Sequence, residues 1–322
     1  MSKLIIQIPC YNEAKTLGIT LAELPRSVPG FHCVEWLVVD DGSEDDTVRV
    51  ALDQGVNHIV RHTRNRGLAQ AFMTGLDACL RHAADVIVNT DADNQYCAAD
   101  IPKLTAPVLA GQADIVIGAR PIEQIEHFSP IKKMLQKLGS WVVRVISKAD
   151  VADAASGFRA ISRSAAQRLV VFDNYTYTLE TLIQAGQKNM LVRSVPVRVN
   201  PDLRPSRLVK SILSYVWRST LTIIRIFVIY RPARFFGGIA ILLFSMGFLI
   251  GLRFLFYYMK GETGHVQSLI LASILLITGF QTFLMAFIAD LQAANRKLLE
   301  DVRFMQKDRP VSMPTFGQVE ER

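Results

Sequence analysis

Two aspartates spaced two residues apart are the side chains in this sequence whose type and spacing suggest a specific chemistry. Asp91 and Asp93 lie in the stretch Asn-Thr-Asp-Ala-Asp-Asn-Gln at 89–95, after an apolar run at 85–88 that is typical of a buried strand. In α/β proteins ligands bind beyond the carboxyl ends of the strands, so this loop is predicted to lie at a binding edge. Carboxylate oxygens suit a hard cation such as Mg²⁺ or Mn²⁺, which usually also holds substrate phosphates. The alternative is an acidic surface loop without a ligand.

A second acidic pair follows the apolar run at 34–39. Asp40 and Asp41 precede Gly42, which permits a tight turn, and Ser43, which can cap a helix. A carboxylate here can accept a hydrogen bond from the base or the ribose of a nucleoside. The alternative is that both aspartates serve only the turn and the helix cap.

The elements that must position these loops alternate along residues 1–120. The sequence predicts strands in its apolar, β-branched runs and helices in the segments between them. The predicted strands lie at 4–8, 34–39, 57–60, 85–89 and 113–118, and the predicted helices at 14–24, 45–53, 67–82 and 99–110. This alternation indicates an α/β fold with a mostly parallel sheet covered on both faces. The first strand is followed by no Gly-x-Gly-x-x-Gly and no Walker loop, which argues against dinucleotide-binding and P-loop proteins.

The composition indicates an ordered chain with excess positive charge. The chain has 322 residues, of which 50% are hydrophobic, a net charge of +7 and a pI of about 9.3. Its four cysteines lack metal-type and disulfide-type spacing, so we expect reduced thiols. The first apolar run is short and is stopped by Pro9. We therefore expect no secretory signal and a first domain that stays on the side of the membrane where it is made.

Two apolar segments, at about 235–258 and 267–289, are long enough to cross a bilayer. The segment 204–234 before them carries seven basic residues and no acidic one, and basic residues also follow the second span. Positive charge at both ends of a hairpin predicts that both ends lie in the cytoplasm. We therefore expect a multi-pass protein of the cell (inner) membrane with a cytoplasmic first domain and cytoplasmic termini. Anionic lipid accounts for the basic segment better than nucleic acid does.

Two further segments have an amphipathic pattern. Apolar residues recur at helical spacing from Pro130 to Ile146, and basic residues occupy the other face. Arg207, Arg218 and Arg225 share one face of a predicted helix before the first span. These helices are predicted to lie on anionic lipid. The alternative for the first of them is a surface helix of a soluble domain.

Six short motifs, in this order, resemble those of family 2 glycosyltransferases and most closely those of the dolichyl- and polyprenyl-phosphate sugar synthases. The resemblance covers residues 3–210. The motifs are Pro9-Cys10-Tyr11-Asn12-Glu13, Asp40-Asp41-Gly42-Ser43-Glu44-Asp45-Asp46-Thr47, Asn65-Arg66-Gly67, Asp91-Ala92-Asp93-Asn94-Gln95, Gly118-Ala119-Arg120 and Ser156-Gly157-Phe158-Arg159. The resemblance implies a Rossmann-like GT-A fold, a nucleotide-sugar donor, a divalent metal and inversion at the anomeric carbon.

The resemblance also implies which residues contact the donor. The residues that would contact the nucleoside are Pro9, Tyr11, Glu13, Asp41 and Asp91. The residues that would hold Mg²⁺ or Mn²⁺ are Asp91, Asp93 and Gln95, with Asp91 bridging from the metal to the ribose.

Three arginines are candidates for the phosphates of donor and acceptor. The resemblance implies that Arg120 faces the diphosphate or the acceptor phosphate. Arg159 follows a glycine that permits close backbone approach, and its guanidinium suits a phosphate. Arg207 stands at 206–208, Ser-Arg-Leu, where the related synthases carry a basic residue.

The combined prediction is transfer of a single sugar to polyprenyl phosphate, undecaprenyl or dolichyl, at the cytoplasmic membrane face. A phosphate acceptor is largely ionised near neutral pH, because its second pKa is about 6, and so needs no general base. The chain lacks Gln-x-x-Arg-Trp, which argues against polymerisation. Two alternatives stay open. One is a family 2 enzyme with a hydroxyl acceptor, for which Asp153 or Glu180 would be the base, and the other is a nucleotide-binding membrane scaffold without turnover.

The expected organisation follows from these segments. It comprises a GT-A domain at 1–203, a basic juxtamembrane helix at 204–234, a transmembrane hairpin at 235–289 and a cytoplasmic tail at 290–322. The expected partners are a nucleoside-diphosphate sugar, polyprenyl phosphate and an anionic bilayer. The sequence leaves open the donor sugar, its base (GDP or UDP) and whether the chain forms a homo-oligomer.

Overall fold

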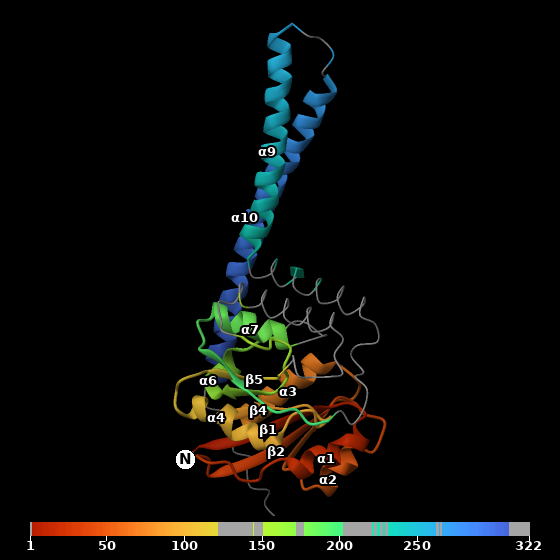
Figure 1. The fold of residues 1–322 in the computed structure, drawn as a ribbon, viewed down its shortest axis with the longest axis vertical. Coiled ribbons are helices and arrows are strands. Elements are labelled where there is room, and N and C mark those ends of the chain that lie inside the picture. The colour runs from red at the N-terminus through yellow and green to blue at the C-terminus, as the bar shows by residue number, and fades with distance from the viewer. Residues whose placement is uncertain are drawn as a thin grey trace, which may run out of the picture. The chain divides into compact units, whose positions relative to one another are not determined.

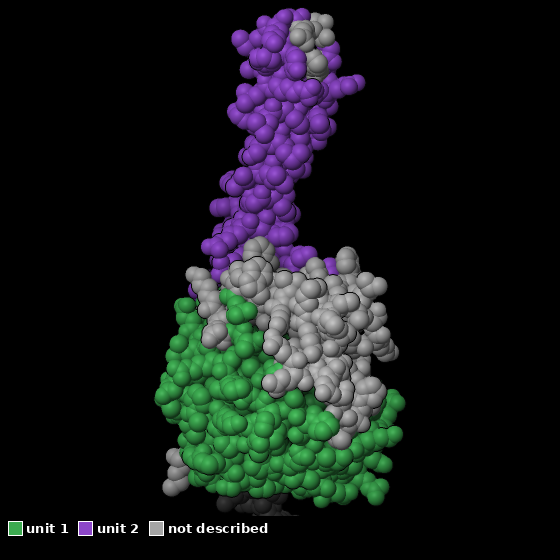
Figure 2. All heavy atoms as spheres, in the orientation of Figure 1, with its two compact units in different colours: residues 1–216, 306–322 green, residues 217–305 purple. Residues whose placement is uncertain are grey.

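The computed structural model describes residues 2–121, 144, 151–171, 177–201, 221, 224–225, 228, 231–261, 264 and 266–308. The chain divides into two compact units, which are residues 1–216 with 306–322 and residues 217–305 (Figure 2). The first unit holds the predicted sheet, and the second holds the predicted membrane spans.

A seven-stranded sheet in the order β3-β2-β1-β4-β6-β5-β7 forms the centre of the first unit (Figure 1). Its strands are β1 (Lys3–Cys10), β2 (Cys33–Asp40), β3 (His58–Arg61), β4 (Val86–Asn89), β5 (Ile115–Ala119), β6 (Arg159–Ser162) and β7 (Val192–Pro196). Among the strands that the structure describes, β6 alone runs antiparallel to its neighbours β4 and β5, and the other pairings are parallel. The fold is therefore a GT-A-like, mostly parallel mixed sheet, as the sequence predicted.

Helices cover both faces of this sheet (Figure 1). They are α1 (Ala14–Glu23), α2 (Thr47–Asp53), α3 (Leu68–Arg81), α4 (Ile101–Leu109), α6 (Arg163–Arg168) and α7 (Thr178–Gln187), with a short 3₁₀ turn η1 (Ala98–Asp100) before α4.

The hydrophobic core lies between the sheet and these helices. On one face, Val38 packs in a buried cluster with Leu17 of α1 and Leu104 of α4. On the other face α3 approaches closely, since a Cβ added to Gly75 would lie 3.1 Å from Val39 Cγ2. Successive residues of a strand point to opposite faces, so the central strands are buried on both sides. Burial on both sides is the reason that they read as continuous apolar runs.

The strands predicted within residues 1–120 correspond to β1 through β5, and the predicted helices to α1 through α4 with η1. The sequence did not predict β6 and β7. The four residues of β6, Arg-Ala-Ile-Ser, include a charged and a polar residue, and β7 is partly exposed and ends in Pro196. Such short, mixed segments lack the apolar run that marked the other strands.

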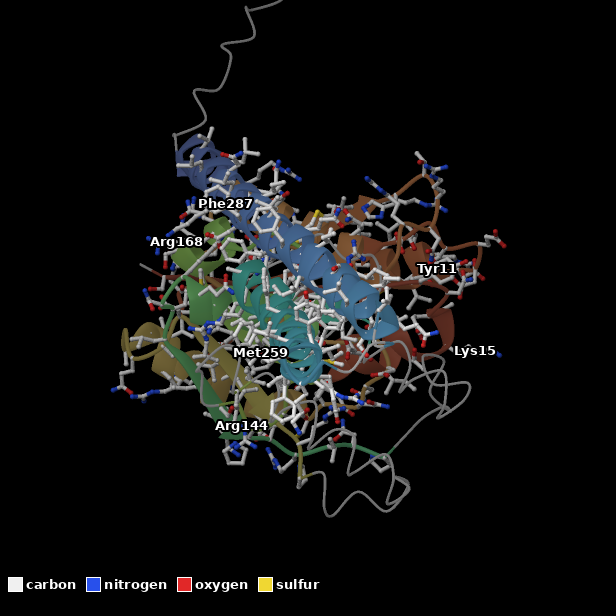
Figure 3. The ribbon with its side chains drawn as sticks, turned by 90° about the horizontal axis from the view of Figure 1, so that it is seen from above. Tyr11, Lys15, Arg144, Arg168, Met259 and Phe287 are labelled. Atoms are coloured by element: carbon white, nitrogen blue, oxygen red, sulfur yellow. The ribbon has the colours of Figure 1, made fainter. Side chains whose placement is uncertain are left out.

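The second unit contains α9 (Pro232–Met259) and α10 (Val266–Asp308) up to Met305. Their most apolar windows have mean hydropathies of 2.3 and 2.1, and only 11% and 17% of those windows are buried. Side chains such as Met259 and Phe287 extend outward from them (Figure 3). A core helix of a soluble protein would be mostly buried, so length, composition and exposure together favour membrane spans.

Two glycines let α9 and α10 pack closely. A Cβ on Gly247 of α9 would lie 3.0 Å from Leu276 Cγ, and a Cβ on Gly279 of α10 would lie 3.0 Å from Phe244 Cδ2. Small residues at such crossings allow the backbones of membrane helices to approach. The two helices therefore pack together as the predicted hairpin.

The helix α10 continues past the predicted end of the second span. The predicted span ends at Ala289, whereas α10 runs to Asp308 without a break. The stretch 290–308 contains neither glycine nor proline and is rich in Ala, Leu, Gln, Lys and Arg, which favour helix. Most of the predicted amphipathic segments at 130–146 and 204–234 lies outside the described residues, so their structure and the predicted domain boundaries stay predictions.

Candidate active site

The predicted site residues that the structure describes lie at one edge of the sheet. The parallel strands β1, β2, β4 and β5 end there, and the antiparallel β6 begins there, because Arg159 at its start pairs with Asn89 at the end of β4. This single reversed strand brings the Ser-Gly-Phe-Arg segment to the loop that contains Asp91. The two motifs are far apart in the sequence but adjacent in the fold.

The carboxylate of Asp91 rests against Gly157. A Cβ on this glycine would lie 2.9 Å from Asp91 Oδ2 and 3.0 Å from Oδ1, so only glycine leaves room for the carboxylate. Burial raises the pKa of Asp91 to about 7, and the negative charge of Asp93 adds to the rise. The positive charges of Arg120 and Arg159 act in the opposite direction. Two carboxylates thus repel each other in a partly dehydrated place, which a divalent cation would relieve.

The side chains around Asp91 fit a hard divalent cation that is shared with a ligand. Asp91, Asp93 and Gln95 lie on one loop, and the atoms that their side chains offer as metal ligands are oxygens. Within this loop the backbone N–H of Gln95 donates a hydrogen bond to Asp93 Oδ1 at 3.2 Å. Within the described ranges no group of three or more His, Cys, Asp or Glu side chains is arranged to hold a metal. A cation held by one or two carboxylates and completed by substrate phosphates is the usual arrangement for Mg²⁺.

The loop that contains these residues is anchored from both sides. The Ala92 carbonyl accepts a hydrogen bond from Thr20 Oγ1 at 3.1 Å, and Asn94 Nδ2 donates to Glu23 Oε1 at 3.0 Å. The Gln95 carbonyl accepts from the N–H of Asn200 at 2.9 Å. Helix α1 and the chain after β7 therefore fix the loop between them.

The predicted nucleoside residues after β1 are tied to the loop after β2. Pro9 is buried within β1, Tyr11 is exposed, and Glu13 directly precedes α1 (Figure 3 labels Tyr11). The Glu13 N–H donates to Thr47 Oγ1 at 2.8 Å, and the Glu13 carboxylate accepts from Thr16 Oγ1 at 2.9 Å. These bonds fix Glu13 at the binding edge. The contacts of Tyr11 and Glu13 with a nucleoside stay predictions.

Asp41 connects the loop after β2 to the start of α3. Its carboxylate accepts hydrogen bonds from the N–H groups of Arg66 and Gly67, at 2.9 and 2.8 Å, and lies 2.7 Å from His62 Nδ1. Gly42 next to it has a φ of +74°, which confirms the predicted need for glycine in the turn. The structure thus gives Asp41 internal partners, and its contact with the nucleoside stays a prediction.

The neighbouring Asp40 is buried, and only one of its two carboxylate oxygens accepts a hydrogen bond among the described residues. Its Oδ1 accepts from the N–H of Ser43 at 3.1 Å, and its Oδ2 lies 3.0 Å from Arg61 Nε. Among the residues that the structure describes, this Oδ2 has no partner with hydrogen-bond geometry. The predicted turn role therefore holds for Asp40, with one carboxylate oxygen engaged only by charge.

Arg120 is held by Asp153. Its Nε lies 2.7 Å and its Nη2 3.1 Å from the two carboxylate oxygens, and both side chains are largely buried. A third hydrogen bond to Asp153 comes from the N–H of Ala155. Asp153 thus orients Arg120 at the site, which leaves this carboxylate poorly placed to act as a general base. The other candidate base, Glu180, is buried in the first turn of α7.

Arg159 is fully buried and holds the loop before β6. Its guanidinium donates to the carbonyls of Ala154 and Ser156, at 3.0 and 2.8 Å, and to Thr181 Oγ1 at 2.7 Å. These partners are parts of the protein, and the phosphate contact of Arg159 stays a prediction. Arg207, the third arginine, lies outside the described residues.

Sequence reasoning missed a set of buried polar side chains beneath the site. Gln7, Asn89, Tyr96 and Tyr177 lie at or below the edge where Asp91 and Gly157 meet. A signal was present in the sequence, because Gln7 interrupts an apolar strand and Asn89 ends another. Buried polar residues in such strands normally have specific partners.

Comparisons with known proteins agree with this geometry. The model of the family "Glycosyl transferase family 2" matches residues 5–170. The chain is 30% identical over 202 residues to an undecaprenyl-phosphate mannosyltransferase of Micrococcus luteus, a match that covers 59% of this chain and 80% of the relative. It is 28% identical over 213 residues to a UDP-N-acetylglucosamine–dolichyl-phosphate N-acetylglucosaminyltransferase of Methanococcus voltae, covering 59% and 83%.

A solved structure has the same fold. Glucosyl-3-phosphoglycerate synthase of Mycobacterium tuberculosis, crystallised with Mn²⁺, UDP and glucosyl-3-phosphoglycerate, superposes with a TM-score of 0.54. The match covers 70% of this chain and 79% of that protein, at 19% sequence identity.

Proposed function

Because the chain belongs to glycosyl transferase family 2 and is a glycosyltransferase, we propose that it transfers one sugar from a nucleoside diphosphate to polyprenyl phosphate. The transfer inverts the anomeric carbon and takes place at the cytoplasmic face of a membrane. The observation that carries this proposal is the meeting of the Asp91 carboxylate, Gly157 and the Arg120–Asp153 pair at one edge of the sheet.

The donor diphosphate binds beside Asp91 and Asp93. These carboxylates, with Gln95, would hold Mg²⁺ or Mn²⁺, which would supply positive charge against the charge that develops on the departing diphosphate. Arg120, oriented by Asp153, adds a fixed positive charge at the same place. The nucleoside lies along the loops that contain Tyr11, Glu13 and Asp41. A structurally similar enzyme was crystallised with Mn²⁺ and UDP, which supports the use of a divalent metal in general.

The acceptor is a phosphate, and the engagement of Asp153 with Arg120 favours a phosphate over a hydroxyl acceptor. A hydroxyl acceptor would need a base to take its proton, whereas both oxygens of Asp153 already accept hydrogen bonds from Arg120. A phosphate monoester attacks without losing a proton, since its second pKa of about 6 leaves it largely ionised. The protein then has to hold two anions together, and the positive charges of the arginines and of a bound cation would offset their repulsion. Two relatives are named for undecaprenyl and dolichyl phosphate acceptors.

The long apolar helices α9 and α10 suit an acceptor that resides in a membrane. Their side chains are mostly exposed, as a lipid-facing surface requires, and basic residues flank both ends of the pair. This distribution of charge supports a cytoplasmic site. A lipid-linked substrate and the enzyme would thus share the same bilayer.

A transfer assay with matched variants tests the proposal. Purified full-length protein in detergent is given undecaprenyl phosphate, Mn²⁺ or Mg²⁺, and one of a set of GDP- and UDP-sugars. At least one donor should be consumed by the wild type and by Asp53→Asn, a control at an exposed aspartate at the end of α2. Asp93→Asn should lower turnover at least about 100-fold, because a metal ligand is lost. Normal metal-dependent turnover by a folded Asp93→Asn protein would remove Asp93 from the site.

A further inference from the structure

A chain of buried polar side chains runs beneath the site from β1 to α7. Gln7 Nε2 donates to Asn89 Oδ1 at 2.9 Å. Asn89 Nδ2 donates both to the carbonyl of Gly157, at 2.8 Å, and to the hydroxyl of Tyr177, at 2.9 Å. Gln7 and Asn89 have no exposed surface, and Tyr177 is 1% exposed. Asn89 therefore connects three separate segments of the first unit.

The chemistry of these contacts requires an amide at position 89. The carbonyl of Gly157 can only accept, so it fixes Asn89 Nδ2 as the donor and leaves Oδ1 to accept from Gln7. Gly75 of α3 makes room for Gln7, because a Cβ on this glycine would overlap Gln7 Oε1. Aspartate at position 89 has nearly the same shape but would turn an oxygen toward the carbonyl of Gly157.

Gly157 connects this network to the metal-site carboxylate. Its carbonyl is bound by Asn89, and its N–H donates to the hydroxyl of Tyr96 at 3.0 Å. The Asp91 carboxylate and the Tyr177 hydroxyl both lie on the side of Gly157 where a side chain would project, since an added Cβ would lie 2.9 Å from Asp91 Oδ2 and 2.9 Å from Tyr177 Oη. The position of the Gly157 backbone therefore limits where the carboxylate of Asp91 can lie.

The other partners of the network are rigid. The ring of Tyr177 stacks on Phe72 of α3, with ring centroids 3.9 Å apart and planes 7° apart. The ring of Tyr96 stacks on Phe158, with centroids 5.0 Å apart. A fully satisfied buried polar network fixes one arrangement of its members, because any displacement leaves a buried group without a partner.

We propose that Asn89 is a positioning residue for the metal site: through Gly157 and Tyr177 it holds the surface on which the Asp91 carboxylate rests, and so sets the affinity for the divalent cation. Asn89 itself contacts neither the cation nor the donor. This inference rests on the proposed function, because it assumes that Asp91 is a metal ligand. Residues that orient metal ligands typically change metal affinity by about 10- to 100-fold when they are replaced.

The test compares Asn89→Asp and Asn89→Ala with Gln184→Ala in the full-length protein. Gln184 is a suitable control because it is also a fully buried amide, and among the described residues its side chain bonds the backbone of Val170. The affinity for Mn²⁺ is measured by electron paramagnetic resonance in the presence of UDP and, separately, GDP. The thermal midpoint and the circular dichroism of each variant are recorded in the same detergent.

The inference predicts that both Asn89 variants weaken Mn²⁺ binding by about 10- to 100-fold while keeping the wild-type circular dichroism. Turnover should recover largely at high Mn²⁺, so the metal requirement changes more than the turnover number. Gln184→Ala should lower the thermal midpoint by about as much as the Asn89 substitutions do, but it should leave the affinity for Mn²⁺ unchanged.

Two other results would overturn the inference, each in a different way. If the wild type binds Mn²⁺ and the folded Asn89 variants bind it equally well, or if Gln184→Ala weakens it as much, the positioning role is wrong and the proposed function stands. If the wild type fails to bind Mn²⁺ both in the presence of UDP and in the presence of GDP, the metal site of the proposed function is wrong. The inference about Asn89 is then overturned with it.

Discussion

At the scale of single residues, partners within the protein decide what each charged side chain can do. Arg120 and Arg159 look alike in the sequence, but Arg120 is held by Asp153 at the binding edge, whereas Arg159 donates to two carbonyls and Thr181 in the interior. The motifs predicted that both arginines contact phosphates, which stays a prediction, and in the structure the positive charges of both act on Asp91. The partners of each arginine could not be predicted, because they depend on the loop at 153–157.

Gly157 gives a prediction at this scale. Gly157→Ala should weaken Mn²⁺ binding and lower turnover by at least about 10-fold, because the new methyl group would displace the Asp91 carboxylate or the Tyr177 hydroxyl. Mn²⁺ titration of the variant measures the effect.

The matched control for this glycine is Gly18→Ala in α1. The added Cβ would lie 3.5 Å from Val50 Cγ1, an ordinary contact, and alanine favours helix by about 1 kcal/mol over glycine. Gly18→Ala should therefore keep Mn²⁺ affinity and hold or raise the thermal midpoint. Wild-type affinity in Gly157→Ala would show that the carboxylate does not depend on this contact.

At the scale of elements, the antiparallel strand β6 does most to build the site. Its reversed direction carries Gly157 and Arg159 to the edge where the parallel strands end. The apolar runs predicted β1 to β5 and thus which loops share an edge. The position of β6 could not be predicted in the same way, because a four-residue strand with one charged residue owes its place to pairing with β4 and β5.

An ion cluster that joins η1 to the chain after β7 gives a second prediction. Burial alone would raise the pKa of Asp100, but hydrogen bonds from Arg198 and Lys103 outweigh it and lower this pKa to about 2. Asp100→Asn should lower the free energy of unfolding by about 1 to 3 kcal/mol at pH 7, because the buried carboxylate also accepts from the N–H of Arg198.

The sign of the pH dependence follows from the lowered pKa. An aspartate in the unfolded chain titrates near about 3.9, so the stabilisation by Asp100 is complete above that pH and is lost as the pH falls toward 2. The difference in thermal midpoint between wild type and Asp100→Asn should therefore shrink from pH 7 to pH 3. Asp53→Asn, at an exposed pair with Arg49, should differ little from wild type at either pH. A difference that stays constant or grows toward pH 3 would contradict the assignment.

At the scale of the whole molecule, composition and structure describe an enzyme with a separate unit of two long apolar helices. The sequence predicted both spans, because uncharged apolar runs of this length are typical of membrane-spanning helices. It did not predict that the second helix runs on to Asp308, since a change from apolar to polar residues does not by itself end a helix.

The orientation of this anchor is a third prediction. A fluorescent reporter fused after the chain should be active in the cytoplasm, because basic residues flank both ends of the α9–α10 pair. Alkaline phosphatase inserted in the turn at Gly261 should be active only on the far side. Carbonate should leave the full-length protein in the membrane fraction. The opposite pair of reporter activities would show that the topology is reversed. Extraction of the protein by carbonate alone would show that the two helices do not span the membrane.

The central claim, that the acceptor is a polyprenyl phosphate, is tested most directly by mass spectrometry of the reaction product. The donor that supports turnover is incubated with full-length protein, Mn²⁺ and an equal mixture of undecaprenyl phosphate and an undecaprenyl-diphosphate-linked saccharide. We expect the product to be undecaprenyl phosphate carrying one sugar on its phosphate, formed by the wild type and lost in Asp93→Asn. A product in which the sugar is found only on a hydroxyl of the saccharide, with undecaprenyl phosphate unchanged, would contradict the account.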